Sequence, residues 1–248
     1  MKIIISPAKK MRVQSDIMEE TGLPVFLEDA ERLKDVLSGM SFGELKNLYR
    51  ANDAITEENY RRLHGMNLKQ GLTPAVLAYV GLQYQSMAPD IFTADEWAYV
   101  KEHLRIISGF YGILRACDGV VPYRLEMQAK LMADGRKDLY GFWESRIYDK
   151  LTEDGDRTIV NLASKEYSKA VEPWLQKEDR YITCVFGQET DGKIKVKATA
   201  AKMARGEMVR FLASQKAAKP EEIKRFDRMG YRFRGEYSTE SQYIFTTT

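Results

Sequence analysis

The chain has 248 residues, of which 44% are apolar and 30% charged, and its net charge is +2, which is ordinary globular composition. The apolar run near the start, Ile3-Ile4-Ile5, is too short for a signal peptide or a membrane helix, which need roughly 7–15 and about 20 apolar residues. Because no Pro/Gly/Ser-rich linker divides the sequence, we expect a single cytoplasmic domain over residues 1–248, without a membrane segment.

The first half of the chain is predicted to be one short strand followed mainly by helices. Residues 2–5 form a buried strand that Ser6-Pro7 ends. From Glu28 to about Leu68 the apolar residues recur at helical spacing. Ala94 to Ile107 is predicted to be a further helix, with Thr93 as its N-cap and Glu96 completing a capping box.

The second half mixes helices with strands. A helix over Leu139–Leu151 precedes a strand over Thr158–Leu162 and a short helix over Glu166–Val171. Ile182, Cys184 and Phe186 alternate, as do Ile194, Val196 and Ala198, and the Asp191-Gly192 pair between them predicts a β-hairpin. The chain is predicted to end with helices over Thr199–Ser214 and Pro220–Met229 and with strands over Tyr231–Arg234 and Gln242–Phe245.

This order of elements predicts the fold class. Helices and strands alternate without a regular βαβ repeat, so the sequence predicts an α+β fold, that is, an irregular mixed α/β arrangement in one compact domain.

Charge is distributed unevenly along the chain. Between Lys193 and Arg234 there are 13 Lys and Arg against 4 Asp and Glu, whereas the rest has 25 against 32. Such asymmetry fits an anionic partner, and it fits equally well a basic C-terminal third that pairs with an acidic remainder of the same molecule.

The segment from Leu33 to Leu45 has the pattern of a helix–hairpin–helix unit, within a helical region of about 28–68. Two helical patterns flank a turn in which Gly39 is expected to adopt a positive φ, and Ser41 with Glu44 forms a capping box. Amides at such a turn favour a phosphate oxygen. Plain helical packing remains the alternative, since any αα-hairpin needs a Gly-containing turn. The candidate DNA-binding residues are Gly39, Ser41, Lys46, Arg50, Arg61 and Arg62.

Five further runs combine glycine, aromatic and charged residues more densely than core packing requires. They are SPAKK at Ser6, SGFYGILR at Ser108, PYRLEM at Pro122, NLASKEY at Asn161 and AKMARG at Ala201. If they converge, they form an anion-binding cleft in which Arg can bind phosphate or carboxylate in bidentate fashion. The alternative is a buried ion-pair network that fixes the fold. The candidate cleft residues are Lys9, Ser108, Tyr111, Arg115, Tyr123, Arg124, Glu126, Asn161, Ser164, Tyr167, Lys202 and Arg205.

The same runs, together with LYGFW at Leu139 and GYRF at Gly230, resemble the YaaA peroxide-stress family, in which they occur in the same order. The chain departs from the family pattern at Ala116, where proline is expected, and at Gln128, where glycine is common. The resemblance implies protection against hydrogen peroxide by restraint of unincorporated intracellular iron. It also implies a DNA-binding fold with a helix–hairpin–helix element and a positively charged cleft. It carries over no catalytic residues.

Three functions are compatible with the sequence. The first is binding of double-stranded DNA through its phosphates, with little base specificity. The second is an enzyme that acts on a small anionic substrate, with Lys9, Tyr111, Tyr123 or Lys202 as acid or base. The third is direct binding of iron, which we disfavour because the two His and two Cys show no ligand spacing and no ExxH pattern occurs.

We predict no metal site and no cofactor. No GxxxxGK[ST], GxGxxG or GxSxG motif occurs, which argues against nucleotide hydrolysis, dinucleotide chemistry and α/β-hydrolase chemistry. The sequence leaves the oligomeric state open.

Overall fold

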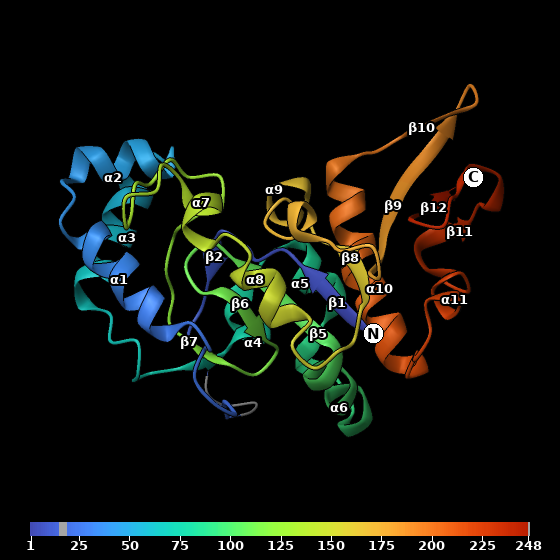
Figure 1. Cartoon of the computed structure of the whole chain (residues 1–248), viewed down its shortest axis with the longest axis horizontal. Coiled ribbons are helices and arrows are strands. Elements are labelled where there is room, and N and C mark those ends of the chain that lie inside the picture. The colour runs from blue at the N-terminus through green and yellow to red at the C-terminus, as the bar shows by residue number, and fades with distance from the viewer. Residues whose placement is uncertain (15–18, 248) are drawn as a thin grey trace.

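The computed structural model, which describes residues 1–14 and 19–247, is built around a mostly parallel sheet (Figure 1). Its strands are β1 (Lys2–Ile5), β5 (Leu104–Ser108), β6 (Gly112–Arg115), β8 (Thr158–Leu162), β9 (Arg180–Thr190), β10 (Lys193–Lys195), β11 (Tyr231–Phe233) and β12 (Gln242–Thr247). Their order is β11–β12–β9–β8–β1–β5–β6, and β10 pairs with β9. Two small sheets pair β2 (Lys10–Met11) with β4 (Tyr79–Val80) and β3 (Thr73–Pro74) with β7 (Gly119–Val120).

The helices surround this sheet. They are α1 (Leu27–Ser38), α2 (Phe42–Tyr49), α3 (Asp53–Gly65), α4 (Ala75–Ala78), α5 (Leu82–Met87), α6 (Ala94–His103), α7 (Leu139–Trp143), α8 (Arg146–Leu151), α9 (Lys165–Ser168), α10 (Ala198–Gln215) and α11 (Pro220–Ile223). Short 3₁₀ turns lie at Pro89–Ile91, Glu172–Trp174, Arg228–Gly230 and Gly235–Tyr237. In Figure 1, α1 to α3 form one end of the molecule, and β11, β12 and α11 form the other.

The N-terminal strand β1 lies in the middle of the sheet, parallel to β5 on one side and to β8 on the other. Its residues Ile3, Ile4 and Ile5 are fully buried, as expected for a strand covered on both faces. Because β1, β5 and β8 run in the same direction, their carboxyl ends meet at one edge of the sheet. This edge is where open α/β sheets bind ligands.

Two glycines let separate motifs approach each other closely. A Cβ on Gly206 would lie 2.0 Å from the carbonyl oxygen of Gln83, so α10 packs on α5 backbone to backbone. A Cβ on Gly109 would lie 2.7 Å from the carbonyl oxygen of Leu125. These contacts explain why glycine follows Arg205 and Ser108 in the motifs of the sequence.

The predicted fold class is confirmed: the molecule is a mixed α/β structure with one continuous buried core, which extends from Ile3 in β1 to Phe245 in β12. The β-hairpin of β9 and β10 is also confirmed, with Asp191 and Gly192 at φ values of 52° and 70° in its turn. No helix within the described ranges is both long and apolar enough to cross a membrane.

Four predicted helices were too long. The short helix predicted over Glu166–Val171 ends at Ser168 as α9. The helix from Ala94 ends at His103, because residues 104–107 join the sheet as β5 beside β1. The helix over Leu139–Leu151 is broken at Glu144, whose φ of 45° separates α7 from α8. The helix from Pro220 ends at Ile223 and is followed by a separate 3₁₀ turn that begins at Arg228.

The turn between α1 and α2 differs from the expectation in its backbone. Ser41 caps α2 and forms the predicted capping box with Glu44. Gly39, however, has a φ of −78° and lies in the right-handed region, so the expected positive φ was wrong. The region is a set of three short helices, and the structure does not confirm a helix–hairpin–helix motif.

Candidate anion-binding pocket

A pocket of about 290 Å³ lies at the carboxyl ends of β1 and β8. We call it the strand-end pocket. Residues from five segments of the chain line it, four of which belong to the runs named above. They are Ser6, Pro7, Ala8, Lys9, Lys10, Val80, Gly81, Leu82, Gln83, Tyr84, Glu126, Ser164, Glu166, Tyr167, Lys202 and Arg205. The structure therefore brings together residues of the SPAKK, PYRLEM, NLASKEY and AKMARG runs, which are far apart in sequence.

Four cations line this pocket and outnumber its two carboxylates. Lys9 forms an ion pair with Glu126, with 3.3 Å between Nζ and Oε1. Lys10, Lys202 and Arg205 have no carboxylate partner within the part of the chain that the structure describes. Lys202 and Arg205 reach the same pocket because they are three residues apart on α10.

Arg205 is the most confined of these cations. Burial lowers the pKa of its guanidinium, which nevertheless remains protonated because the ordinary pKa of Arg is so high. Its Nε is buried and has no hydrogen-bond acceptor in the described structure. The same is true of the donor Nε2 of Gln83, a residue that is 7% exposed. An oxygen of a bound anion would satisfy such donors.

The carboxylates of the pocket have different surroundings. Glu126 lies between Lys9 and Arg124, and its Oε1 is 3.1 Å from the Arg124 guanidinium. Glu166 accepts a hydrogen bond from the backbone N–H of Gln128, and burial raises its pKa, assisted by the nearby charge of Glu126. Glu166 therefore takes up a proton more readily than an ordinary glutamate.

Ser6 and Ser164 hold the floor of the pocket together. The Ser6 hydroxyl accepts a hydrogen bond of 2.8 Å from the Ser164 backbone N–H, which ties the end of β1 to the end of β8. Tyr84 donates from its hydroxyl to the carbonyl of Ser6 at 2.9 Å. Tyr167 is buried, and burial raises its pKa far above the ordinary value. These groups are fixed neutral donors and acceptors.

Several predicted cleft residues lie behind the pocket. The Tyr123 hydroxyl is hydrogen-bonded to Ser108 at 2.6 Å and to Tyr79 at 2.8 Å, all inside the core, and burial raises its pKa to about 12. Tyr111 is fully buried and its hydroxyl accepts the N–H of Val121. Asn161 is 3% exposed and accepts the N–H of Ala163, so it shapes the turn before Ser164.

Two predicted cleft residues, Arg124 and Arg115, do not line the strand-end pocket. Arg124 holds Glu126 from behind the pocket and also donates to the carbonyl of Tyr49 at 3.4 Å. Arg115 lies elsewhere, in a second cavity next to Arg105 and Asp118. No pattern in the sequence pointed to Gln83, and Lys10, which lies next to Lys9 in the SPAKK run, was not predicted as a cleft residue.

Most of the cations predicted to bind DNA in the helical region already form ion pairs with neighbouring carboxylates. Lys46 pairs with Asp53, Arg61 with Glu57 and Arg62 with Glu58, at 2.6 to 2.7 Å.

The backbone amides at the turn also have partners. Those of Gly39 and Met40 donate to carbonyls of α1, and that of Ser41 donates to the Glu44 carboxylate. Arg50 differs, because its exposed side chain has no carboxylate partner among the residues described.

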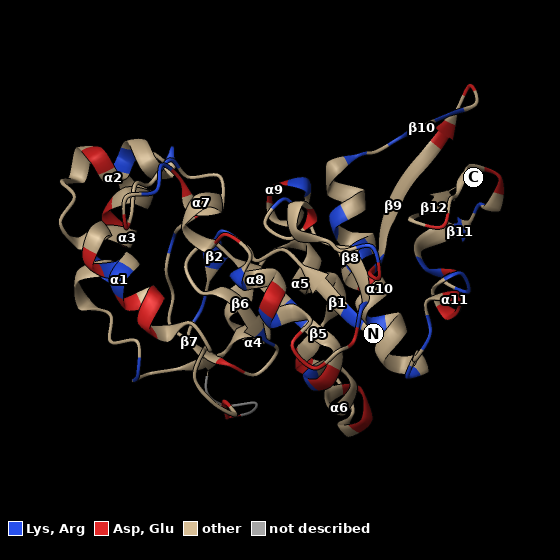
Figure 2. Cartoon of the chain, viewed as in Figure 1, with Lys and Arg blue, Asp and Glu red and all other residues tan. Residues whose placement is uncertain are grey.

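Further cations extend away from the strand-end pocket. Figure 2 shows Lys and Arg on α9, on the N-terminal half of α10 and along β10, at the same upper edge of the view. Lys193 and Lys195 of β10 are exposed and have no ion-pair partner in the described ranges. Lys165 of α9 pairs only at 3.5 Å with Glu172. We call these residues, with Lys169, the lysine rim.

Fold and pocket together define a mixed α/β protein with a cation-rich pocket at the carboxyl ends of its parallel strands. The chain belongs to the peroxide stress protein YaaA family, which its residues 1–237 match. It is 50% identical over 245 residues to a UPF0246 protein of Pediococcus pentosaceus, covering 99% of this chain and 97% of that protein. UPF0246 proteins of Agathobacter rectalis and Desulfitobacterium hafniense are 48% and 49% identical over 245 residues, with coverage of 99% of this chain and 98% and 97% of those proteins.

Proposed function

We propose that this member of the peroxide stress family binds double-stranded DNA through its phosphates, at the mouth of the strand-end pocket and along the lysine rim. The observation that carries the proposal is the position of Lys202 and Arg205 on one face of α10, where no carboxylate neutralises them within the described residues. Lys202 is exposed and Arg205 is partly buried in the pocket, and cations without internal carboxylate partners are free to replace the counterions of a duplex.

The proposed DNA-contacting surface is not the turn at Gly39 that the sequence predicted. Three of the cations near that turn already pair with carboxylates, and the Glu44 carboxylate covers the N-terminus of α2. A phosphate at that N-terminus would meet the negative charge of Glu44 and would have to displace it. Arg50 is the residue of this region that remains available to a duplex.

Binding should be measured by fluorescence anisotropy with a labelled duplex over a range of salt concentrations. The logarithm of the affinity should fall with the logarithm of the salt concentration, with a slope of about −0.9 for each phosphate contacted. The double variants Lys202→Gln/Arg205→Gln and Lys193→Gln/Lys195→Gln should each lower the magnitude of the slope, by roughly 1 for every contact removed.

The matched control is Arg61→Gln/Arg62→Gln, which removes the same charge from α3, where both residues are already paired. It should leave affinity and slope unchanged. Flat affinity across the salt series contradicts the proposal. If only the α3 variant loses affinity for the duplex, the DNA contacts lie in the helical region instead.

A second candidate function is catalysis on a small anionic substrate in the same pocket. It is favoured by the unsatisfied donors of Gln83 and Arg205 and by the raised pKa of Glu166, which suits proton transfer. Glu166→Gln distinguishes the two functions. It should abolish turnover if the pocket is catalytic, and it should leave duplex binding intact or slightly tighter because it removes a negative charge.

We further propose that, in the cell, the protein limits unincorporated iron. Among the described residues, no three His, Cys, Asp or Glu side chains are grouped to hold a metal ion. The cellular test complements a strain that lacks the gene with the wild type or with Lys202→Gln/Arg205→Gln. Iron detected by electron paramagnetic resonance under peroxide should remain high with the variant if the pocket carries the function.

A further inference from the structure

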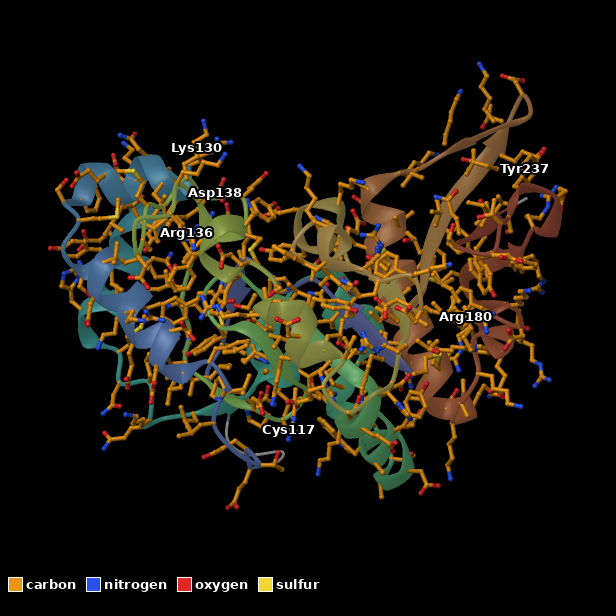
Figure 3. All side chains as sticks on the ribbon, viewed as in Figure 1. Cys117, Lys130, Arg136, Asp138, Arg180 and Tyr237 are labelled. Atoms are coloured by element: carbon orange, nitrogen blue, oxygen red, sulfur yellow. The ribbon has the colours of Figure 1, made fainter. Side chains whose placement is uncertain are left out.

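A second cavity lies at the opposite end of β5 from the strand-end pocket. Its volume is about 220 Å³, and it is lined by Leu23, Val25, Arg105, Ile113, Leu114, Arg115, Asp118, Lys150 and Glu153. We call it the β6-edge cavity. In Figure 3, Cys117, which precedes Asp118, lies in the lower part of the view.

Two arginines face each other across the strands of this cavity. β5 and β6 are antiparallel, and Arg105 lies directly opposite Arg115 in their register. Residues directly opposite in a strand pair lie on the same face of the sheet, and like charges in such a pair destabilise it. An arrangement of this kind is stabilised when an anion binds between the two guanidinium groups.

Each of the two guanidinium groups keeps N–H donors that have no acceptor among the described residues. Arg105 donates from one nitrogen, Nη1, to backbone carbonyls including those of Glu102 and Leu104. The Arg115 side chain is exposed and has no hydrogen-bond or ion-pair partner among the residues that the structure describes. Lys150 adds a third cation but already pairs with Glu153 at 2.6 Å. Donors of both arginines therefore remain for a ligand.

The walls of the cavity are firmly held. α8 packs on β6 and supplies Lys150, while the segment before α1 supplies Leu23 and Val25. That segment is fixed to the loop after β6, since Thr21 donates its N–H to the Cys117 carbonyl and Gly119 donates to Gly22. Leu23 and Val25 are 46% and 47% exposed, so they form an apolar rim. Its three cations, Arg105, Arg115 and Lys150, outnumber the carboxylates of Asp118 and Glu153, so the cavity combines a floor of excess positive charge with an apolar edge.

We propose that the β6-edge cavity is a second anion-binding site, which binds a small organic anion through Arg105 and Arg115 and contacts its apolar part with Leu23 and Val25. The ligand carries a carboxylate or a phosphate, since both fit the planar donor geometry of Arg. The cavity is smaller than the roughly 300–1,000 Å³ of sites for drug-sized molecules, which restricts the ligand to a small metabolite. The site is independent of the proposed function of the strand-end pocket.

The test uses benzoate and phenyl phosphate as probes, in the full chain with Lys202→Gln/Arg205→Gln to silence the strand-end pocket. Titration followed by NMR of the arginine Nε–Hε groups should show saturable binding of at least one probe at Arg105 and Arg115. Adding Arg115→Gln should weaken binding at least tenfold, and Arg105→Gln should act in the same direction. Because Arg115 is exposed, its substitution leaves the fold intact even if that of Arg105 does not.

Arg61→Gln is the charge-matched control on α3 and should leave probe binding unchanged. Binding of benzoate alone or of phenyl phosphate alone supports the site and identifies the head group. If neither probe saturates, or if Arg115→Gln binds both as tightly as its parent, the proposal is overturned.

Discussion

At the scale of single residues, burial determines the charge state of Asp118 beside the β6-edge cavity. The residue is 7% exposed, and burial raises its pKa to about 6, although the backbone N–H of Arg115 and the nearby arginines favour the charged form. An unfolded Asp titrates near about 3.9. The folded state therefore binds this proton more tightly than the unfolded state.

The stability of the protein should depend on pH through this residue. For a carboxyl with a raised folded pKa, the stabilisation is fully present below the unfolded pKa and is lost as pH rises through about 6. Asp118→Asn cannot ionise. The free energy of unfolding of the wild type relative to this variant should therefore fall by about 2 kcal/mol between pH of about 4 and about 7.

Urea unfolding of both proteins at each pH measures this difference, and the other titrating groups largely cancel in it. A difference that stays constant with pH would show that Asp118 has an ordinary pKa in the folded protein. Asn keeps a carbonyl oxygen that can accept from Arg115, so the comparison isolates the charge.

The direction in which each strand or helix runs decided which of the predicted cleft residues lie in the strand-end pocket. Lys202 and Arg205 were expected to share a face of one helix, and both line the strand-end pocket. Arg115 was expected beside them, but the chain reverses at Gly112, so that β6 carries Arg115 back to the start of β5. Gln83 was missed because a single glutamine gives no signal until α5 packs on α10.

At the scale of elements, backbone contact between helices α5 and α10 positions the cations of the pocket. Gly206 follows Arg205, and no side chain separates it from the carbonyl of Gln83. Any displacement of α10 would therefore move Lys202 and Arg205 relative to Lys9.

Gly206→Ala should disrupt this contact. The added Cβ would lie 2.0 Å from a backbone oxygen, so the helices must separate, and overpacking of this kind costs about 1–3 kcal/mol or more. We expect a lower urea midpoint and weaker duplex binding. The matched control is Gly43→Ala in α2, where the added Cβ would meet no atom within 4 Å from the described residues outside its own helix backbone and chain neighbours, and helix propensity favours Ala by roughly 0.8–1 kcal/mol. Equal stability of the two variants would contradict the close packing.

Element boundaries were predictable where local signals decide them. Thr93 and Glu96 begin α6, and Asp191-Gly192 forms the hairpin turn, because capping and turn chemistry act within a few residues. The end of α6 was not predictable. Ile106 and Ile107 continue a plausible helical pattern, and only their pairing with distant strands selects β5. Long-range pairing overrides local preference there.

At the scale of the whole molecule, the sheet joins the first strand of the chain to the last. β12 inserts between β11 and β9, and its Phe245 is fully buried with ring contacts to Phe186, Phe226 and Phe233. The three helices at the other end pack on the same continuous core. This arrangement predicts that both ends unfold together, as expected for the single domain inferred from the sequence.

Phe245→Ala tests this cooperativity. Truncating a buried Phe costs about 3–5 kcal/mol, because it removes apolar contacts and leaves a cavity. Trp143, fully buried, packs on Phe26 and Phe142 near α1. In a background that carries Trp97→Phe and Trp174→Phe, the remaining tryptophan fluorescence therefore reports on the opposite end of the molecule. In one cooperative unit the urea midpoints from fluorescence and from far-UV circular dichroism should fall equally. Ile91→Ala, at a residue 63% exposed, is the control that should shift neither. An unshifted fluorescence midpoint, with a lower one by circular dichroism, would divide the chain into two units, because a loss at β12 would then leave the surroundings of Trp143 folded.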